Sequence, residues 1–225
     1  GKGGDVKIPE KVTAIGDMAF SGRSDVTSVE FTKDVTWIGE KAFENCTGLK
    51  GVFTPPSNLA YIGDSAFAGC TGITEVELQN KPMTVGTHIF EDCTSLQKVI
   101  IPKTMGTIPD YTFYGCRSLT DITIDKEITA IGVHAFDGCT SLAAFQFPLK
   151  TTAVGDYAFK GCKSLSEITF ERALESIGYL VFNDTAWFKA QVETQKSTPP
   201  AQTEEVNIDE NKYVIVGRDI IIYYI

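Results

Sequence analysis

The sequence has little histidine, the side chain that most often serves as a catalytic acid or base and as a metal ligand. Its 225 residues include two histidines, three methionines and two tryptophans, and its 20 lysines and arginines are outnumbered by 29 aspartates and glutamates. The net charge of −9 and the lack of a basic stripe argue against a nucleic-acid partner, because a phosphate backbone would be repelled. No stretch approaches the ~18 consecutive apolar residues that a membrane-spanning helix requires. With 43% apolar residues, the chain is instead expected to be globular with a sizeable core.

Repetition is the dominant feature of the sequence. A phrase of the form Ile-Gly-x-x-Ala-Phe-x-Gly-Cys returns eight times with small variations, and a Leu-x-x-Val-x-Ile-Pro type of phrase follows it. The anchoring phenylalanines, 23 or 24 residues apart, are Phe20, Phe43, Phe67, Phe90, Phe113, Phe136, Phe159 and Phe182. A unit this short cannot bury its own apolar side chains, so the units must stack as the coils of a solenoid. The one extra residue falls in the second interval, where we expect the turn residues 54–58 to absorb it.

Each coil is predicted to contain one strand and one outer turn. The Leu-x-x-Val-x-Ile segment alternates in and out, so its copies should form a parallel sheet with about 4.8 Å between coils. Acidic residues stand three positions before five of the phenylalanines; they are Asp17, Glu40, Asp64, Asp110 and Asp156. We expect all but Glu40 to cap one helical or 3₁₀ turn, with calcium binding as the alternative. The residue two positions after each phenylalanine, usually glycine, is expected to take a positive φ.

Cysteine and histidine give little support for a reactive site. The six cysteines share one phase of the repeat; they are Cys46, Cys70, Cys93, Cys116, Cys139 and Cys162. Because they should stack as an inward row of small side chains, we expect free thiols rather than three disulfides, and no Cys-x-x-Cys pair points to a metal. His88 and His134 lie two repeats apart, about 10 Å by coil spacing, and are expected to be exposed residues without a catalytic or metal role.

The repeat resembles that of the BspA-like family of bacterial surface leucine-rich-repeat proteins. The match extends over about residues 6–188 and is clear in the segment 129–142, Thr-Ala-Ile-Gly-Val-His-Ala-Phe-Asp-Gly-Cys-Thr-Ser-Leu. The resemblance implies a curved solenoid, export to the cell envelope, and binding of host matrix proteins or other cells. The sequence departs from the commoner leucine-rich repeat because it has no asparagine ladder after the strand, so other groups must satisfy the backbone at that bend.

The predicted fold is a leucine-rich-repeat solenoid, mostly β with short helical or 3₁₀ turns and no long helix, with a parallel sheet on one face and a C-terminal hairpin. Residues 1–190 are assigned to the solenoid, 191–211 to a polar mobile loop, and 212–225 to a hairpin that packs on or extends the solenoid end. Trp187 and Phe188 replace repeat residues and are expected to cover the last coil as a lid. Residues 6–9 match the strand phrase of a preceding unit, so we expect a fragment or a processed protein.

The outward residues of the strands are the predicted partner-binding surface. The candidates are Glu30, Phe53, Glu75, Glu77, Lys98, Ile100, Asp121, Thr123 and Glu167. Most are polar, with more acid than base, whereas Phe53 and Ile100 are large apolar residues on a polar face and can anchor a partner. Isolated apolar residues are also common on protein surfaces, so the alternative of no special role stays open.

The sequence favours a non-enzymatic binding or adhesion module, secreted or at the cell surface, that recognises a protein or glycan through the sheet face. The alternative is a structural spacer in a longer envelope protein whose recognition residues lie elsewhere. The sequence shows no nucleophile with its base, no phosphate-binding glycine loop and no dinucleotide fingerprint, so we expect no enzyme activity and no metal or other cofactor. Any membrane attachment is expected to come from an anchor outside this chain.

Overall fold

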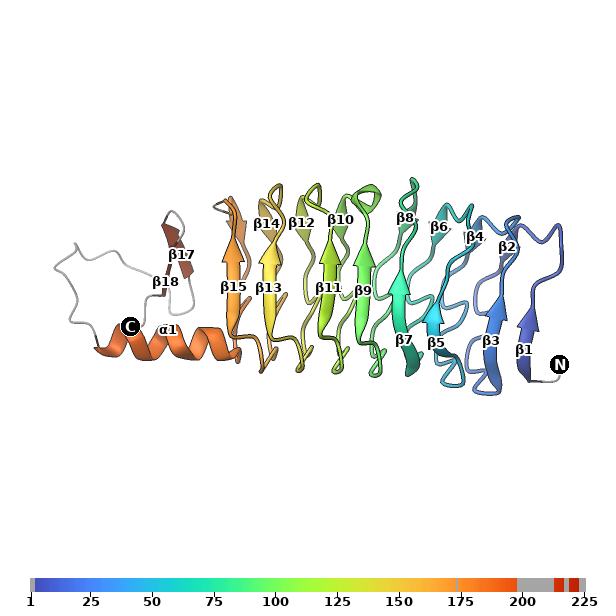
Figure 1. Cartoon of the computed structure of the whole chain (residues 1–225), viewed down its shortest axis with the longest axis horizontal. Helices are drawn as coiled ribbons and strands as arrows, with labels where there is room; N and C mark the ends of the chain where they lie inside the picture. The colour runs from blue at the N-terminus through green and yellow to red at the C-terminus, as the bar shows by residue number, and fades with distance from the viewer. Residues whose placement is uncertain (1–2, 173, 198–212, 217–218, 223–225) are drawn as a thin grey trace.

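A computed structural model describes residues 3–172, 174–197, 213–216 and 219–222 of the chain. Residues 4–185 wind into stacked coils that each contribute a long and a short strand, and Figure 1 shows the two rows of strands along the rod. The long strands are β1 (Gly4–Lys7), β3 (Val26–Glu30), β5 (Lys50–Phe53), β7 (Gly72–Glu77), β9 (Lys98–Ile101), β11 (Asp121–Ile124), β13 (Ala144–Phe147) and β15 (Glu167–Phe170). The short strands are β2 (Ala14–Ile15), β4 (Trp37–Ile38), β6 (Tyr61–Ile62), β8 (Thr84–Val85), β10 (Thr107–Ile108), β12 (Ala130–Ile131), β14 (Ala153–Val154) and β16 (Ser176–Ile177). A 3₁₀ turn, η1 (Lys103–Met105), lies between β9 and β10.

Neighbouring coils pair in parallel, with equal phases of the repeat in register over most of the rod. Glu75 of β7, for example, lies opposite Lys98 of β9, and Lys98 lies opposite Asp121 of β11. Hydrogen bonds divide the long strands into three sheets, β1-β3, β5-β7-β9-β11 and β13-β15. They divide the short strands into β2-β4-β6-β8 and β10-β12-β14-β16. The predicted solenoid with a parallel sheet is thus confirmed.

The repeated phenylalanines form one continuous stack through the core. Neighbouring rings lie within 21° of parallel, and their centroids are 4.9–6.0 Å apart from Phe20 to Phe182. Phe20, in the first coil, is half-buried, whereas the other seven rings are at most 1% exposed. Inward residues of both rows of strands surround the stack, so each coil covers the apolar side chains of its neighbour.

The turn around each phenylalanine from Phe20 to Phe159 bonds to the following coil. The backbone N–H of Phe43, for example, donates to the carbonyl oxygen of Ala66 at 2.8 Å. Positive φ is confirmed at all eight predicted positions, such as Gly69 (φ 70°). A second left-handed residue, not predicted, stands two positions before each phenylalanine, as at Lys41 (φ 53°). Because an L-residue at such a φ does not continue a right-handed helix, these segments are turns, which corrects the expected helical or 3₁₀ geometry.

The acidic row caps backbone groups across the coil boundary. Oδ1 of Asp64 accepts a hydrogen bond from the N–H of Thr87, one repeat further along, at 2.7 Å. Equivalent bonds of 2.7–2.8 Å join Asp17 to Glu40, Asp110 to Val133, and Asp156 to Tyr179. These carboxylates accept backbone hydrogen bonds from the next coil and not from a helical turn that follows them, so the predicted N-cap is wrong. Glycine permits the close approach: a Cβ on Gly63 would lie 2.5 Å from the backbone nitrogen of Glu40.

The cysteines supply hydrogen bonds between coils as well as packing. All six are free and buried, as predicted. Each Sγ donates to the carbonyl oxygen of the phenylalanine in the preceding coil at 3.0–3.3 Å. At the bend after the strand, local bonds take the place of an asparagine ladder; the N–H of Ile128, for example, donates to the carbonyl oxygen of Asp125 at 3.2 Å.

The second coil departs from its neighbours by one residue, which changes the side chains that β5 presents. The register between β5 and β7 shifts at Gly51 (φ 80°) and Val52, so that Phe53 lies opposite the buried Val76. Phe53 is therefore only 8% exposed, whereas Val52 is 58% exposed. The prediction that Phe53 faces outward is wrong, and the extra residue enters before Val52 rather than at 54–58. A glycine allows it there because glycine adopts a positive φ without steric cost.

The last coil ends in a helix, α1 (Ala186–Ser197). Thr185, in the cysteine position of the eighth repeat, starts this helix as its N-cap, since its Oγ1 accepts a hydrogen bond from the N–H of Phe188 at 3.0 Å. Trp187 and Phe188 pack against the core, which confirms the predicted lid. The capped helix corrects two expectations, that no long helix forms and that the loop begins at residue 191; residues 198–211 lie outside the described ranges.

The predicted C-terminal hairpin is present as two strands. β17 (Tyr213–Val216) pairs antiparallel with β18 (Asp219–Ile222). Its packing on the solenoid end stays a prediction. Among the described residues, no helix combines the length and the apolar character that crossing a bilayer requires.

Candidate binding surface

The face of the long strands brings six of the nine candidate residues together. They form two rows across β7, β9 and β11: Glu75, Lys98 and Asp121 in one, and Glu77, Ile100 and Thr123 in the other. These side chains point away from the core because they alternate with inward residues such as Val76 and Val99, which are at most 1% exposed. These six residues are called the central patch below.

The other three candidates lie apart from the central patch. Glu30 of β3 is exposed and forms an ion pair with Lys7 of β1, with 2.9 Å between Oε2 and Nζ. Glu167 of β15 is exposed and lies opposite Ala144 of β13, in a separate sheet. Phe53 is buried, and Val52 is the exposed apolar residue of β5 in its place.

The central patch carries negative charge that ion pairs do not neutralise. Glu75, Glu77 and Asp121 are exposed, and among the described residues none of them forms an ion pair within 4.0 Å. Lys98 is the basic residue of the patch, so three carboxylates and one ammonium leave a net charge of −2. This sign agrees with the net charge of −9 for the chain. The patch therefore attracts cationic groups, more strongly at low salt.

The long-strand sheet is interrupted on both sides of β5-β7-β9-β11. Within the described ranges, no backbone hydrogen bond joins β3 to β5 or β11 to β13. Both interruptions precede a strand with phenylalanine, Phe53 or Phe145, at the inward position that holds valine or isoleucine in the other coils. These rings press on the core stack, with centroid distances of 4.3 Å from Phe53 to Phe67 and 4.5 Å from Phe145 to Phe159. Because a phenylalanine ring is wider than valine in a close-packed core, we attribute the lost strand pairing to it.

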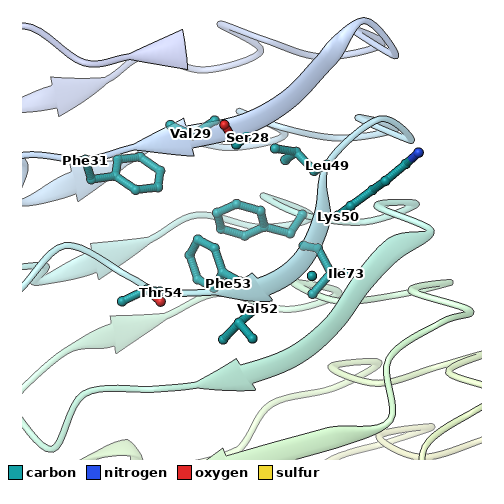
Figure 2. Close-up of a pocket in the computed structure, with 11 residues that line it drawn as sticks. Ser28, Val29, Phe31, Leu49, Lys50, Val52, Phe53, Thr54 and Ile73 are labelled. Carbon is teal, nitrogen blue, oxygen red and sulfur yellow. The ribbon is translucent and has the colours of Figure 1, made fainter. Parts of the chain in front are cut away.

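The interruption between β3 and β5 opens a small apolar cavity, and Figure 2 shows the side chains around it. Its volume is about 90 Å³. It is lined by Ser28, Val29, Phe31, Leu49, Lys50, Gly51, Val52, Phe53, Thr54, Phe67 and Ile73. A larger cavity of about 350 Å³ lies at the interruption between β11 and β13, and its lining includes Lys126, Gln146 and Glu171. Neither cavity was predicted from the sequence. The available signal was the spacing counted back from Phe67 and Phe159, which places Phe53 and Phe145 in the valine phase.

A second cluster, also not predicted, lies on the outer turns. His88, Tyr111, His134 and Tyr157 share one position in four successive coils, and their rings stack with centroid distances of 4.4, 4.7 and 4.7 Å. Nδ1 of His134 lies 2.6 Å from Oδ2 of Asp137. Both histidines are half-buried in this stack, which corrects the expectation that they are exposed. The signal in the sequence was their common phase, two residues before the phenylalanine.

Burial limits the reactions that these histidines, Asp137 and the cysteines can support. The two ring faces of His134 are covered by Tyr111 and Tyr157. Burial raises the pKa of the Asp137 carboxyl, and the hydrogen bond with His134 opposes this only in part. Burial also raises the pKa of the Cys93 thiol well above its ordinary value, which keeps it protonated and a poor nucleophile. In the described part of the chain, no three His, Cys, Asp or Glu residues are grouped to hold a metal ion.

Comparisons with known proteins place the chain among bacterial repeat proteins. Residues 4–117 and 106–197 match the family described as BspA type Leucine rich repeat region, in six copies. Among solved structures, the chain is similar to a leucine rich cell surface protein from Faecalibacterium prausnitzii, with 34% identity and a TM-score of 0.68 over 76% of this chain and 48% of that one. It is similar to a leucine-rich repeat protein from Bacteroides ovatus, with 28% identity and a TM-score of 0.60 over 81% of this chain and 59% of that one. The leucine-rich repeat protein of T. pallidum is 25% identical, with a TM-score of 0.58 over 86% and 84% of the two chains.

The match is partial in length for two of these structures. The chain spans about half of the F. prausnitzii protein and about three fifths of the B. ovatus protein. No curated protein matches the chain.

Proposed function

The chain belongs to the BspA-type leucine-rich repeat family, and from this we propose that it is a non-enzymatic binding module that recognises a protein or glycan at a cell surface through its long-strand face. The central patch is the observation that carries the proposal. Inward positions repeat the same residue types from coil to coil, whereas the outward residues of β7, β9 and β11 differ in charge and size. A rigid scaffold with a varied, solvated face is the arrangement that repeat proteins use for binding.

A non-enzymatic role is supported by where the reactive side chains lie. The six thiols are buried. The closest His–Asp pair, His134 and Asp137, is held between two tyrosine rings and is itself largely covered. Neither arrangement offers a substrate a nucleophile beside its base.

A cell-surface location is proposed from one relative, the F. prausnitzii protein described as a leucine rich cell surface protein. A structural spacer within a longer envelope protein is the second candidate function. It is favoured by the greater length of two similar proteins, of which this chain spans 48% and 59%. In that case recognition resides in other parts of the molecule.

Matched charge variants test the proposal. Glu77→Lys changes the central patch, and Glu10→Lys changes the net charge equally at an exposed residue that lies outside the long strands. The purified chain and both variants are tested for binding to immobilised matrix proteins, to a panel of cell-surface glycans and to whole cells. We expect Glu77→Lys to change binding while the melting temperature stays within a few degrees, and Glu10→Lys to have no effect. If all three chains bind every captured ligand equally, the long-strand face is not the binding surface. If none of the chains binds any ligand, the spacer function is favoured.

A further inference from the structure

We infer that the cavity between β3 and β5 is the anchor point of the binding face, and that it receives an aliphatic side chain from a basic segment of a partner protein. The inference rests on the proposed function and makes it more specific, because it selects a protein over a glycan. Three features of the interruption carry it: the size of the cavity, the unpaired polar groups beside it, and the charge of the neighbouring strands.

The size and lining of the cavity suit a leucine or isoleucine side chain. Its volume is about 90 Å³, and Phe31, Leu49 and Phe53 supply apolar walls. An apolar protein cavity of roughly 150 Å³ accepts benzene, so a smaller one fits a branched aliphatic group better than an aromatic ring. Val52, which also lines the cavity, is 58% exposed and extends the apolar lining to the protein surface. A sugar hydroxyl would lose its hydrogen bonds to water in such a site.

Polar groups of the backbone and of one side chain lie unused along the same interruption. No backbone hydrogen bond links β3 to β5 in the described part of the chain. Just beyond β3, the buried hydroxyl of Thr32 also has no hydrogen-bond partner among the described residues. Buried polar groups are normally paired, and leaving one unpaired is costly. A peptide backbone supplies both donors and acceptors, so an incoming polypeptide segment can pair with the free edge of β3 or β5 while its side chain enters the cavity.

The charge around the cavity selects a basic segment. Glu75 and Glu77 are exposed on β7, next to β5, and no ion pair engages them within the described residues. Asp121 extends the negative surface two strands further. Lys50 is the basic residue in the cavity lining, and Figure 2 shows its side chain extending away from the phenylalanine rings. Cationic side chains that flank the aliphatic anchor therefore meet carboxylates, which raises the association rate and makes it dependent on salt.

Synthetic peptides test the anchor directly. The probes are lysine-rich peptides of about 15 residues, long enough to cross several strands, that differ only in a central leucine, alanine or tryptophan. A glutamate-rich peptide with the central leucine controls for charge. Binding to the whole chain is measured by isothermal titration calorimetry. We expect the leucine peptide to bind about tenfold or more tightly than the alanine peptide, the tryptophan peptide to gain nothing over leucine, and the glutamate-rich peptide not to bind.

Two variants that each introduce a phenylalanine complete the test. Ser28→Phe places a ring at the mouth of the cavity from an exposed position, and Thr169→Phe places one on the same face, on the distant β15. We expect Ser28→Phe to abolish the advantage of leucine over alanine and Thr169→Phe to preserve it, with both variants folded by circular dichroism.

In the peptide assays, three results overturn the inference. They are equal affinity for the leucine and alanine peptides, an advantage of leucine that survives Ser28→Phe, and no binding of any lysine-rich peptide. The proposed function fails separately, since it is decided by the Glu77→Lys and Glu10→Lys variants against surface ligands. If Glu77→Lys changes the binding of a surface ligand and Ser28→Phe does not, the long-strand face is the binding surface but the cavity is not its anchor.

Discussion

Removing one ring from the middle of the phenylalanine stack should destabilise the whole solenoid. Phe113 is fully buried and stacks on Phe90 at 6.0 Å and on Phe136 at 5.4 Å. Phe113→Ala therefore leaves a cavity and removes two ring pairs. Truncating a buried phenylalanine costs about 3–5 kcal/mol in total. Because this ring also has two stacked partners, we expect a cost in the upper part of that range, about 4–5 kcal/mol.

The first coil provides the matched control. Phe20 is half-buried and has one ring neighbour in the stack, Phe43 at 4.9 Å, so Phe20→Ala should cost about half as much. Urea unfolding followed by circular dichroism measures both costs. If Phe113→Ala unfolds the chain, Phe113→Leu, which keeps most of the volume, should still cost about 1–2 kcal/mol. Equal costs for the alanine variants at positions 113 and 20 would refute a core shared between coils.

Further predictions concern other groups of the scaffold. Because the pKa of Asp137 is raised, the native state keeps the proton on this carboxyl to a higher pH than the unfolded chain does. The contribution of Asp137 to the unfolding free energy therefore falls as the pH rises from the ordinary pKa of 3.8. Asp137→Asn should remove that fall, as measured by urea titrations at successive pH values. The buried thiols should react with a thiol reagent only as fast as the chain opens, and fast labelling of all six in the folded protein would contradict their burial. Thr185→Cys restores the repeat residue but removes the N-cap of α1, and should cost about 1 kcal/mol and lower the helical signal.

The repeat itself could be predicted from the sequence because identical phases must meet when coils stack. The phenylalanine stack, the row of free cysteines and the positive φ at Gly69 and its equivalents all follow from that one condition. The outward direction of six candidate residues on β7, β9 and β11 could be predicted, because the two-residue period of a strand fixes which side chains face outward.

The features that could not be predicted from the sequence are set by a single inserted residue or by contacts with the neighbouring coil. Phe53 was assigned outward because its position was counted forward from Phe43, and a one-residue bulge at Gly51 exchanges the two faces of a strand. The partner of Asp64 is 23 residues away, whereas capping rules describe bonds within one turn. The interruption between β3 and β5 arises from ring width, which alternation of apolar and polar residues does not encode.

The claim that Phe53 opens the sheet can be tested by restoring the repeat residue. In Phe53→Val, β3 and β5 should approach and pair as β7 and β9 do, since valine occupies this position in both of those strands. Hydrogen–deuterium exchange of backbone amides in β3 and β5 measures this most directly. We expect slower exchange in both strands of the variant, with no change at the second interruption between β11 and β13, which Phe145 maintains. Unchanged or faster exchange in β3 and β5 would contradict the account.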